Sequence, residues 1–153
     1  ISNLKSAIEA LNSIGSITQV SSVFESEPLN MVAESKFLNL CLALDIRITA
    51  DILLIETQRI ELSLGRVQKN TIAYESRTID IDILFIENLK INSDKLKIPH
   101  PEFHNRKFVL VPLNEIAPNF IDPNSNCTIN SILDKCSDTS IPWVHSENVH
   151  LHE

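Results

Sequence analysis

Two aspartates, Asp80 and Asp82, are the residues of this 153-residue chain whose type and spacing most clearly indicate chemistry. They lie in the run SRTIDIDILFI, residues 76–86, whose apolar alternation predicts a buried β-strand. On such a strand both carboxylates share one face, with Cα atoms about 6.6–6.8 Å apart. Two ionised carboxylates so close repel each other, and a divalent cation such as Mg²⁺, which prefers oxygen ligands, would relieve that repulsion. The alternative is a sheet with one wet face, on which both aspartates are simply solvated.

Basic residues near this run could bind the phosphates that a protein-bound magnesium ion commonly carries. Arg77 precedes the first aspartate by three residues, and a guanidinium binds phosphate bidentately. His100, bracketed by Pro99 and Pro101, and Arg106 belong to a loop that could close over the same site. Taken singly, each could equally be a surface cation or a turn residue. Their combination with the aspartates favours a phosphate-binding site.

The elements that must hold these residues alternate loosely between helices and strands. Helical spacing predicts a first helix from Leu4 to Ile14 and a second one that Thr49 caps and Gly65 ends. Period-two spacing predicts strands from Ile17 to Phe24 and from Phe37 to Ile48. This order favours an α+β fold in which helices cover one face of a mainly antiparallel sheet.

Beyond the aspartate run the pattern is weaker. A turn and a short strand are predicted over residues 87–92, and a strand-and-loop region over 97–118, around the apolar run from Phe108 to Val111. Residues 130–136 predict a short helix. The tail from His145 to Glu153 is polar, and we expect it to fray.

Composition limits the classes of function. A formal net charge of −7 argues against non-specific nucleic-acid binding. The length and the 43% hydrophobic content indicate one domain, residues 1–153. With only two glycines, a glycine-rich phosphate loop is excluded, so a nucleotide would be held by side chains and metal. Three cysteines without CxxC spacing indicate reduced thiols in a cytoplasmic protein, and no apolar run reaches the length of a membrane span.

Three segments make the chain resemble the 6-hydroxymethyl-7,8-dihydropterin pyrophosphokinase family of folate biosynthesis. They are QRIELSLGRVQKN from Gln58, SRTIDIDILF from Ser76 and IPHPEFHNRKFVLVPLNEIAP from Ile98, with weaker support from SEPLN near Pro28 and FLNLCLAL from Phe37. The resemblance implies a ferredoxin-like α+β fold and a cytoplasmic monomer that binds neither nucleic acid nor membrane. It also implies transfer of pyrophosphate from ATP to the hydroxymethyl group of the dihydropterin, with release of AMP.

The resemblance further implies a role for each matching residue. Two Mg²⁺ ions bound with ATP would be held by Asp80 and Asp82. The implied catalytic residues are Arg66, Arg77, Asp80 and Asp82. The implied ATP-binding residues are Gln58, Glu61, Arg66, Arg77, Ile83, Lys95, Lys97, His100 and Arg106. The implied pterin-binding residues are Ser26, Glu27, Pro28, Leu29, Phe37, Asn39, Tyr74 and Phe108. Of these, the two phenylalanines would stack on the pterin and the asparagine would hydrogen-bond it.

Three features depart from the family pattern. Gln68 stands where a second arginine is common, and residues 74–76 read Tyr-Glu-Ser instead of Trp-Gly-Pro. Family members also begin with a strand and a Gly-Ser-Asn loop, whereas this sequence starts at Ile1. We expect that strand to be missing from this sequence rather than from the natural protein. The departures leave a second interpretation open: a degenerate, non-catalytic ferredoxin-like module that binds a nucleotide or a protein.

Overall fold

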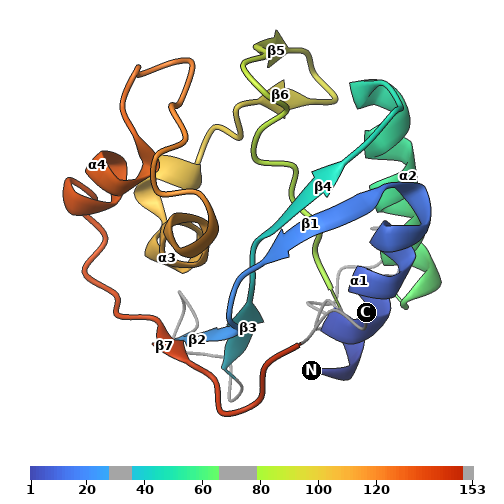
Figure 1. Ribbon diagram of the computed structural model, residues 1–153, viewed down its shortest axis with the longest axis horizontal. Coiled ribbons are helices and arrows are strands. Elements are labelled where there is room, and N and C mark those ends of the chain that lie inside the picture. Colours follow the sequence, from blue (N-terminus) through green and yellow to red (C-terminus); the bar gives the residue numbers. More distant parts are fainter. Residues whose placement is uncertain (28–35, 66–78, 150–153) are drawn as a thin grey trace, which may run out of the picture.

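The computed structural model describes residues 1–27, 36–65 and 79–149. Its elements are helices and short antiparallel strands, so the predicted α+β class is confirmed (Figure 1). In chain order they are α1 (Ser2–Ile14), β1 (Ser16–Val20), β2 (Phe24–Ser26), β3 (Phe37–Asn39), β4 (Leu42–Asp45), α2 (Ala50–Ser63), β5 (Ile91–Asn92), β6 (Lys97–Ile98), the 3₁₀ turn η1 (Phe103–Asn105), α3 (Lys107–Ile116), α4 (Ile129–Asp134) and β7 (Trp143–Val144). Among the helices of these ranges, none combines the length and apolar character that crossing a bilayer requires.

The two long strands predicted before α2 are each divided into two. β1 pairs with β4, and β2 pairs with β3 on one side and β7 on the other, all antiparallel. Between these ladders the backbone N–H of Ser21 donates to the carbonyl of Cys41 at 2.8 Å, and the N–H of Cys41 donates to Ser21 Oγ at 2.9 Å. The serine hydroxyl therefore replaces a ladder bond at the point where both strands break.

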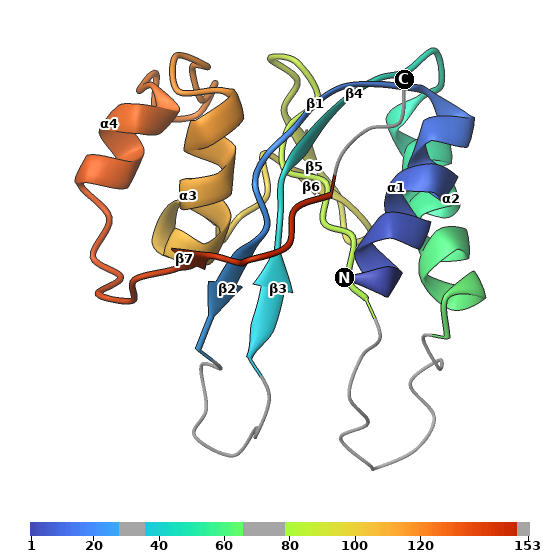
Figure 2. The same ribbon diagram turned by 60° about the horizontal axis from the view of Figure 1, so that its bottom comes forward.

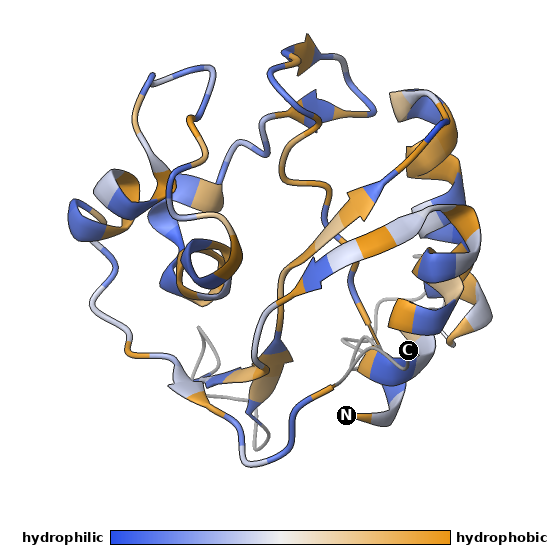
Figure 3. Cartoon of the chain, viewed as in Figure 1, coloured by the Kyte–Doolittle hydropathy of each residue, from blue (hydrophilic) through white to orange (hydrophobic). Residues whose placement is uncertain are grey.

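Helices cover both faces of the strands, so the prediction of helices on one face is wrong. α1 and α2 lie on one side and α3 and α4 on the other (Figure 2). The α1 side buries Ile8 and Val23 with the leucines of 38–42, whereas the α3 side buries Leu110 with Cys41. Burial raises the pKa of Cys41 to about 12, so its thiol is neutral. Because Cys41 and Ala43 on the face opposite the leucines are themselves apolar, that face also needs a cover. Figure 3 shows the apolar course of β4 beside the alternating β1.

Helix boundaries follow the predicted signals, with one difference in cause. Thr49 Oγ1 accepts a hydrogen bond from the N–H of Ile52 at 3.4 Å and caps α2, and Gly65 after its end has φ 99°. That positive φ favours glycine. Gly15 ends α1 in an extended conformation instead, with φ −167°. A Cβ there would lie 2.5 Å from the carbonyl oxygen of Asp45, so close packing on β4 requires the glycine.

The apolar run from Phe108 to Val111 forms the helix α3, not part of a strand-and-loop region. Leu110 and Leu113, one helical turn apart, are both buried. Pro112 lies inside the helix. It concealed the helical pattern because proline lacks the N–H that would bond the carbonyl four residues earlier. The predicted short helix over 130–136 is present as α4, which Thr128 Oγ1 caps by accepting from the N–H of Ser131 at 3.2 Å.

The C-terminal segment does not fray as far as residue 149. The N–H of His145 donates to the carbonyl of Val23 at 2.8 Å, and the N–H of Val23 donates to Asn148 Oδ1 at 3.2 Å. Val149 is buried in the α1-side core. The polar composition of the tail gave no sign of this attachment, because it depends on one apolar residue, one backbone N–H and one asparagine side chain.

Candidate active site

Residues 79–86, which carry both aspartates, form no ladder within the ranges that the structure describes. The strand prediction is therefore wrong for these residues, although the burial pattern behind it is right. Ile79 is buried and Ile81 half-buried, whereas Asp80 and Asp82 are exposed. Alternating apolar residues predict an extended chain with one buried face, but they do not say whether a neighbouring strand pairs with it.

Individual contacts hold this segment in place instead. The N–H of Ile81 donates to Glu61 Oε1 on α2 at 2.7 Å, and the N–H of His100 donates to the carbonyl of Leu84 at 2.9 Å. The ring of Phe85 packs edge-on against Phe103 with centroids 4.8 Å apart. The aspartates are thus connected to α2, to the loop after β6 and to the α3-side core.

Two adjoining hollows lie along the segment, and each is large enough for part of a small-molecule ligand. The first, which we call the aspartate hollow, has a volume of about 380 Å³ and is lined by Leu54, Thr57, Gln58, Glu61, Asp80, Ile81, Asp82, His100 and Arg106. The second, the lysine hollow, has a volume of about 300 Å³ and is lined by Leu54, Ile81, Asp82, Ile83, Asp94, Lys95, Leu96, Lys97, His100 and Pro101. Leu54, Ile81, Asp82 and His100 line both.

The aspartate hollow combines acidic and basic groups. His100 Nδ1 accepts the N–H of Glu102 at 3.1 Å, so a neutral ring carries its proton on Nε2 and can donate from there. The guanidinium of Arg106 lies 5.8 Å from the ring centroid of Phe108. Arg106 therefore connects this hollow to the start of α3.

The acidic groups fit a magnesium ion that is shared with a ligand. Asp80 and Asp82 line the same hollow. Within residues 1–27, 36–65 and 79–149, no three His, Cys, Asp or Glu side chains are grouped so that they could form a complete metal cage. Mg²⁺ typically takes one or two carboxylates and completes its shell with water and substrate phosphates. Two aspartates beside a histidine and an arginine match that requirement.

Of the residues that the resemblance assigns to a pterin, those that the structure describes lie on or directly after β2, on β3 and at the start of α3. Asn39 Nδ2 donates to Ser26 Oγ at 3.0 Å, so a buried serine orients the amide. The side chain of Phe37, two residues earlier on β3, is 54% exposed, which leaves its ring available for stacking. Phe108 is half-buried and Glu27 exposed. α3 packs against β2 and β3, which brings Phe108 to the same region.

Several predicted site residues lie outside the described residues. These are Pro28, Leu29, Arg66, Tyr74 and Arg77, together with Gln68 and Glu75, two of the departures from the family pattern. Of the predicted ATP-binding residues, the aspartate hollow brings together Gln58, Glu61, His100 and Arg106, and the lysine hollow brings together Ile83, Lys95, Lys97 and His100.

Sequence reasoning missed other lining residues. Leu54 and Thr57 line the aspartate hollow from α2. Leu54 lies four residues before Gln58 and Thr57 lies four residues before Glu61, so all four share one side of the helix, and that signal could have found them. Asp94 and Leu96 in the lysine hollow follow a short strand and carry no comparable pattern.

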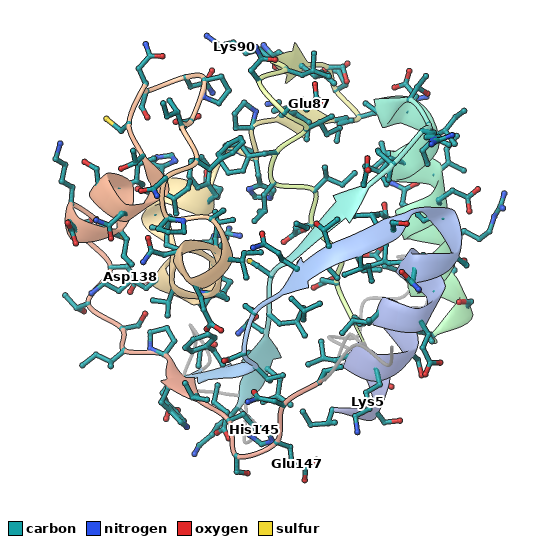
Figure 4. All side chains as sticks on the ribbon, viewed as in Figure 1. Lys5, Glu87, Lys90, Asp138, His145 and Glu147 are labelled. Carbon is teal, nitrogen blue, oxygen red and sulfur yellow. The ribbon has the colours of Figure 1, made fainter. Side chains whose placement is uncertain are left out.

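A charged cluster beside the predicted pterin residues was also missed. Glu25 on β2 pairs with Lys36 at 3.5 Å and with Nδ1 of His145, which is labelled in Figure 4. Lys36 Nζ lies 4.7 Å from the ring centroid of Trp143. The hydrogen bond from His145 holds the pKa of Glu25 below its usual value, against the effect of burial and with the help of Lys36. The C-terminal segment is thereby attached to the ends of the β2–β3 connection.

Two helical layers pack on either side of short strands, which is an α+β arrangement. The carboxylates, the histidine and the arginine around the aspartate hollow are the residue types of a metal-assisted phosphoryl-transfer site. Comparison with known proteins identifies the family. Residues 1–118 match the family model described as 7,8-dihydro-6-hydroxymethylpterin-pyrophosphokinase.

Individual relatives agree with this match. The chain is 35% identical over 127 residues to the 2-amino-4-hydroxy-6-hydroxymethyldihydropteridine pyrophosphokinase of Haemophilus influenzae, covering 82% of this chain and 78% of that protein. It is 39% identical over 118 residues to the protein of the same name from Porphyromonas gingivalis, covering 75% and 80%. A folic acid synthesis protein of Dictyostelium discoideum is 36% identical over 128 residues, which are 84% of this chain and 19% of that one. The chain belongs to the 7,8-dihydro-6-hydroxymethylpterin-pyrophosphokinase family, as its sequence predicted.

Proposed function

We propose that this chain transfers the terminal pyrophosphoryl group of ATP to the hydroxymethyl group of 6-hydroxymethyl-7,8-dihydropterin in folate biosynthesis. The hydroxymethyl oxygen loses its proton to solvent and forms a bond to the β-phosphorus, the bond between that phosphorus and the α,β-bridging oxygen breaks, and AMP leaves. The observation that carries the proposal is the aspartate hollow, in which family-matching Asp80, Asp82, His100 and Arg106 meet. The enzyme is accordingly an ATP-dependent diphosphotransferase.

ATP would occupy both hollows. Leu54, Ile83 and Leu96 give the lysine hollow apolar walls suited to a base, and Lys95 and Lys97 supply cations at its edge. The triphosphate would lie in the aspartate hollow, where His100 donates from Nε2 and Arg106 supplies positive charge. Arg66 and Arg77, implied by the resemblance, would add to this charge.

Asp80 and Asp82 would hold two Mg²⁺ ions together with ATP. When bound, the metal neutralises phosphate charge and polarises the phosphoryl group. The protein's own contribution is then positioning: it keeps both carboxylates on one side of residues 79–86 and places His100 and Arg106 around the same space. No protein nucleophile is needed for this reaction class.

The pterin would stack between Phe37 and Phe108 and hydrogen-bond to Asn39. Support comes from the exposed ring of Phe37 and from Ser26, which orients the Asn39 amide. Main-chain groups from Ser26 to Leu29, with Glu27 among them, and the ring of Tyr74 would complete the pocket. Arg106, which lies over the ring of Phe108, would stand between the pterin and the triphosphate.

Further predictions concern the whole chain. A ferredoxin-like arrangement, one domain over residues 1–153, a monomeric state and a cytoplasmic location remain proposals. The ferredoxin-like arrangement is supported by the element order: α1, the four short strands β1 to β4, α2 and the extended residues 79–86.

The test is release of AMP from ATP in the presence of Mg²⁺ and 6-hydroxymethyl-7,8-dihydropterin. We expect one AMP per pterin pyrophosphate formed, and none when the pterin is omitted. A folded protein that binds Mg-ATP but forms no AMP would contradict the proposal and favour the non-catalytic module.

A further inference from the structure

Glu61 is a buried acidic residue at the edge of the aspartate hollow. Glu61 is only 5% exposed, and its Oε1 accepts a hydrogen bond from the N–H of Ile81 at 2.7 Å. Burying a carboxylate is costly unless it is hydrogen-bonded, and a bond to an ionised acceptor is shorter and stronger than a neutral one. Ile81 is the residue between Asp80 and Asp82, so this bond fixes the backbone at the centre of the acidic pair.

The bond matters because residues 79–86 have no ladder partner in the part of the chain that the structure describes. A segment inside a sheet is held by regular backbone bonds on both sides, whereas this one depends on separate contacts. α2 gives Glu61 a firm base, since Leu53, Thr57 and Ile60 on the same helix are buried. Metal ligands require such outer contacts to keep their oxygen atoms in place.

We propose that Glu61 is a positioning residue whose hydrogen bond to the Ile81 N–H sets Asp80 and Asp82 for Mg²⁺. This inference rests on the proposed function, and it replaces the direct ATP contact that the family resemblance implies for Glu61. Two other roles are possible for a carboxylate here: a third metal ligand or a direct contact with the nucleoside. The three roles predict different results for a glutamine substitution and for nucleotides without a triphosphate.

The test compares Glu61→Gln and Glu61→Met. Glutamine keeps an oxygen acceptor without charge, whereas methionine has a similar length but only a weak acceptor. Calorimetry with a non-hydrolysable ATP analogue at increasing Mg²⁺ should give a Mg²⁺ requirement about tenfold or more higher for Glu61→Met and within about threefold of wild type for Glu61→Gln. Glu56→Gln is the matched control, because Glu56 lies on the same helix and pairs with Arg59.

Three results would overturn the proposal, two from the Mg²⁺ titration and one from a separate titration with AMP. Equal loss in Glu61→Gln and Glu61→Met would indicate a metal ligand, because the charge would then be essential. Weaker binding of AMP without Mg²⁺ in Glu61→Met would indicate a nucleoside contact. AMP release by the wild-type enzyme tests the proposed function separately. If the wild type is active and Glu61→Met has the same Mg²⁺ requirement as the wild type, this inference is refuted and the proposed function stands.

Amide hydrogen exchange supplies a readout that is independent of ligand. In the wild type the N–H of Ile81 should be protected like that of Leu64, which bonds to the carbonyl of Ile60 at 3.1 Å. In Glu61→Met its exchange should accelerate about tenfold or more while Leu64 stays protected, and Glu61→Gln should restore protection. If Glu61→Met does not fold, the wild-type measurement still decides, because an unprotected Ile81 amide would overturn the proposal.

Discussion

Asp80 and Asp82 differ from most acidic residues of the chain in what their removal should change. Asp82 is exposed and packs into no apolar core, so replacing it should leave the free energy of unfolding within about 0.5 kcal/mol of wild type. In the proposed reaction Asp80 and Asp82 hold the metal that neutralises the triphosphate. A substitution of Asp82 should therefore reduce activity without reducing stability.

We predict that Asp82→Ala lowers the rate of AMP formation by about two orders of magnitude or more, since a lost electrostatic contact to the reacting phosphates costs at least that much. The measurement is steady-state AMP release at saturating pterin, together with a urea titration. Asp134→Ala, at the exposed end of α4, is the control and should keep full activity. Activity retained in Asp82→Ala would remove the metal role from this residue.

At the scale of elements, α3 begins at a carboxylate from a distant part of the chain. The N–H of Lys107, the first residue of α3, donates to Oδ2 of Asp138, which is labelled in Figure 4, at 2.8 Å. The N–H of Ser140 donates to Asp138 Oδ1 at 2.8 Å. Burial alone would raise the pKa of Asp138, but the hydrogen bonds from Lys107 and Ser140 outweigh it, so the net pKa is lowered. Asp138 lies beyond residue 118, where the family match ends.

This arrangement predicts a pH-dependent contribution to stability. A carboxyl whose pKa is lower in the folded than in the unfolded protein stabilises the fold above the unfolded value, about 3.9, and that contribution is lost as pH falls through the folded pKa. Asp138→Ala should therefore cost about 1 kcal/mol at pH 7, the usual cost of a lost helix cap. The difference between wild type and variant should shrink between pH 5 and pH 2.

Urea titrations of both proteins across that pH range give the measurement. Asp138→Asn keeps an acceptor oxygen without the charge, so its loss at pH 7 should be smaller than that of Asp138→Ala. A constant difference between wild type and Asp138→Ala down to pH 2 would show that the carboxylate charge adds nothing.

The helices and strands also show how far the sequence could predict the structure. Thr49 and Gly65 mark the ends of α2 because capping and positive φ are local properties of a few residues. α3 was missed because Pro112 contradicts a helix locally while Leu110 and Leu113 are buried by tertiary packing. The second helical face was missed because the order of helices and strands does not say which face of a sheet each helix covers.

The parts of the site that depend on residue type could be predicted from the sequence. The parts that depend on contacts between residues far apart in the chain could not. The alternation around Asp80 correctly placed both aspartates away from the core, and resemblance assigned His100 and Arg106 to the hollow they line. The bond from the Ile81 N–H to Glu61 joins residues 20 positions apart through a backbone group. The spacing of residue types in the sequence does not predict such a bond, because any residue except proline supplies the same N–H.

For the molecule as a whole, the aspartate segment connects one of the two cores to α2. One core lies between α1 and the strands and includes Val149, and the other lies between α3, α4 and the strands. Leu84 and Phe85 pack into the second, while the N–H of Ile81 bonds to α2 on the opposite side. A change in the α3-side core or in α2 therefore reaches the residues that flank Asp80 and Asp82.

We predict that the two cores unfold together, because they share the strands between them. Leu110 is fully buried with an exposed fraction of 0%, so Leu110→Ala should lower the free energy of unfolding by about 2–5 kcal/mol. Ile141→Ala is the control: Ile141 is 81% exposed, and its loss should cost less than about 0.5 kcal/mol. Trp143, the only tryptophan of the sequence, lies on β7 next to β2 and reports on the strands by fluorescence.

Circular dichroism at 222 nm follows the helices of both layers in the same urea titration. If the cores are one cooperative unit, the fluorescence and dichroism transitions of Leu110→Ala coincide and shift together to lower urea. If α3 and α4 formed a separate unit, part of the helical signal would be lost at lower urea while the fluorescence change, near β2 and the α1-side core, came later. Coincident transitions would mean that Asp80 and Asp82 keep their places only while both layers are folded, since their segment has contacts to each.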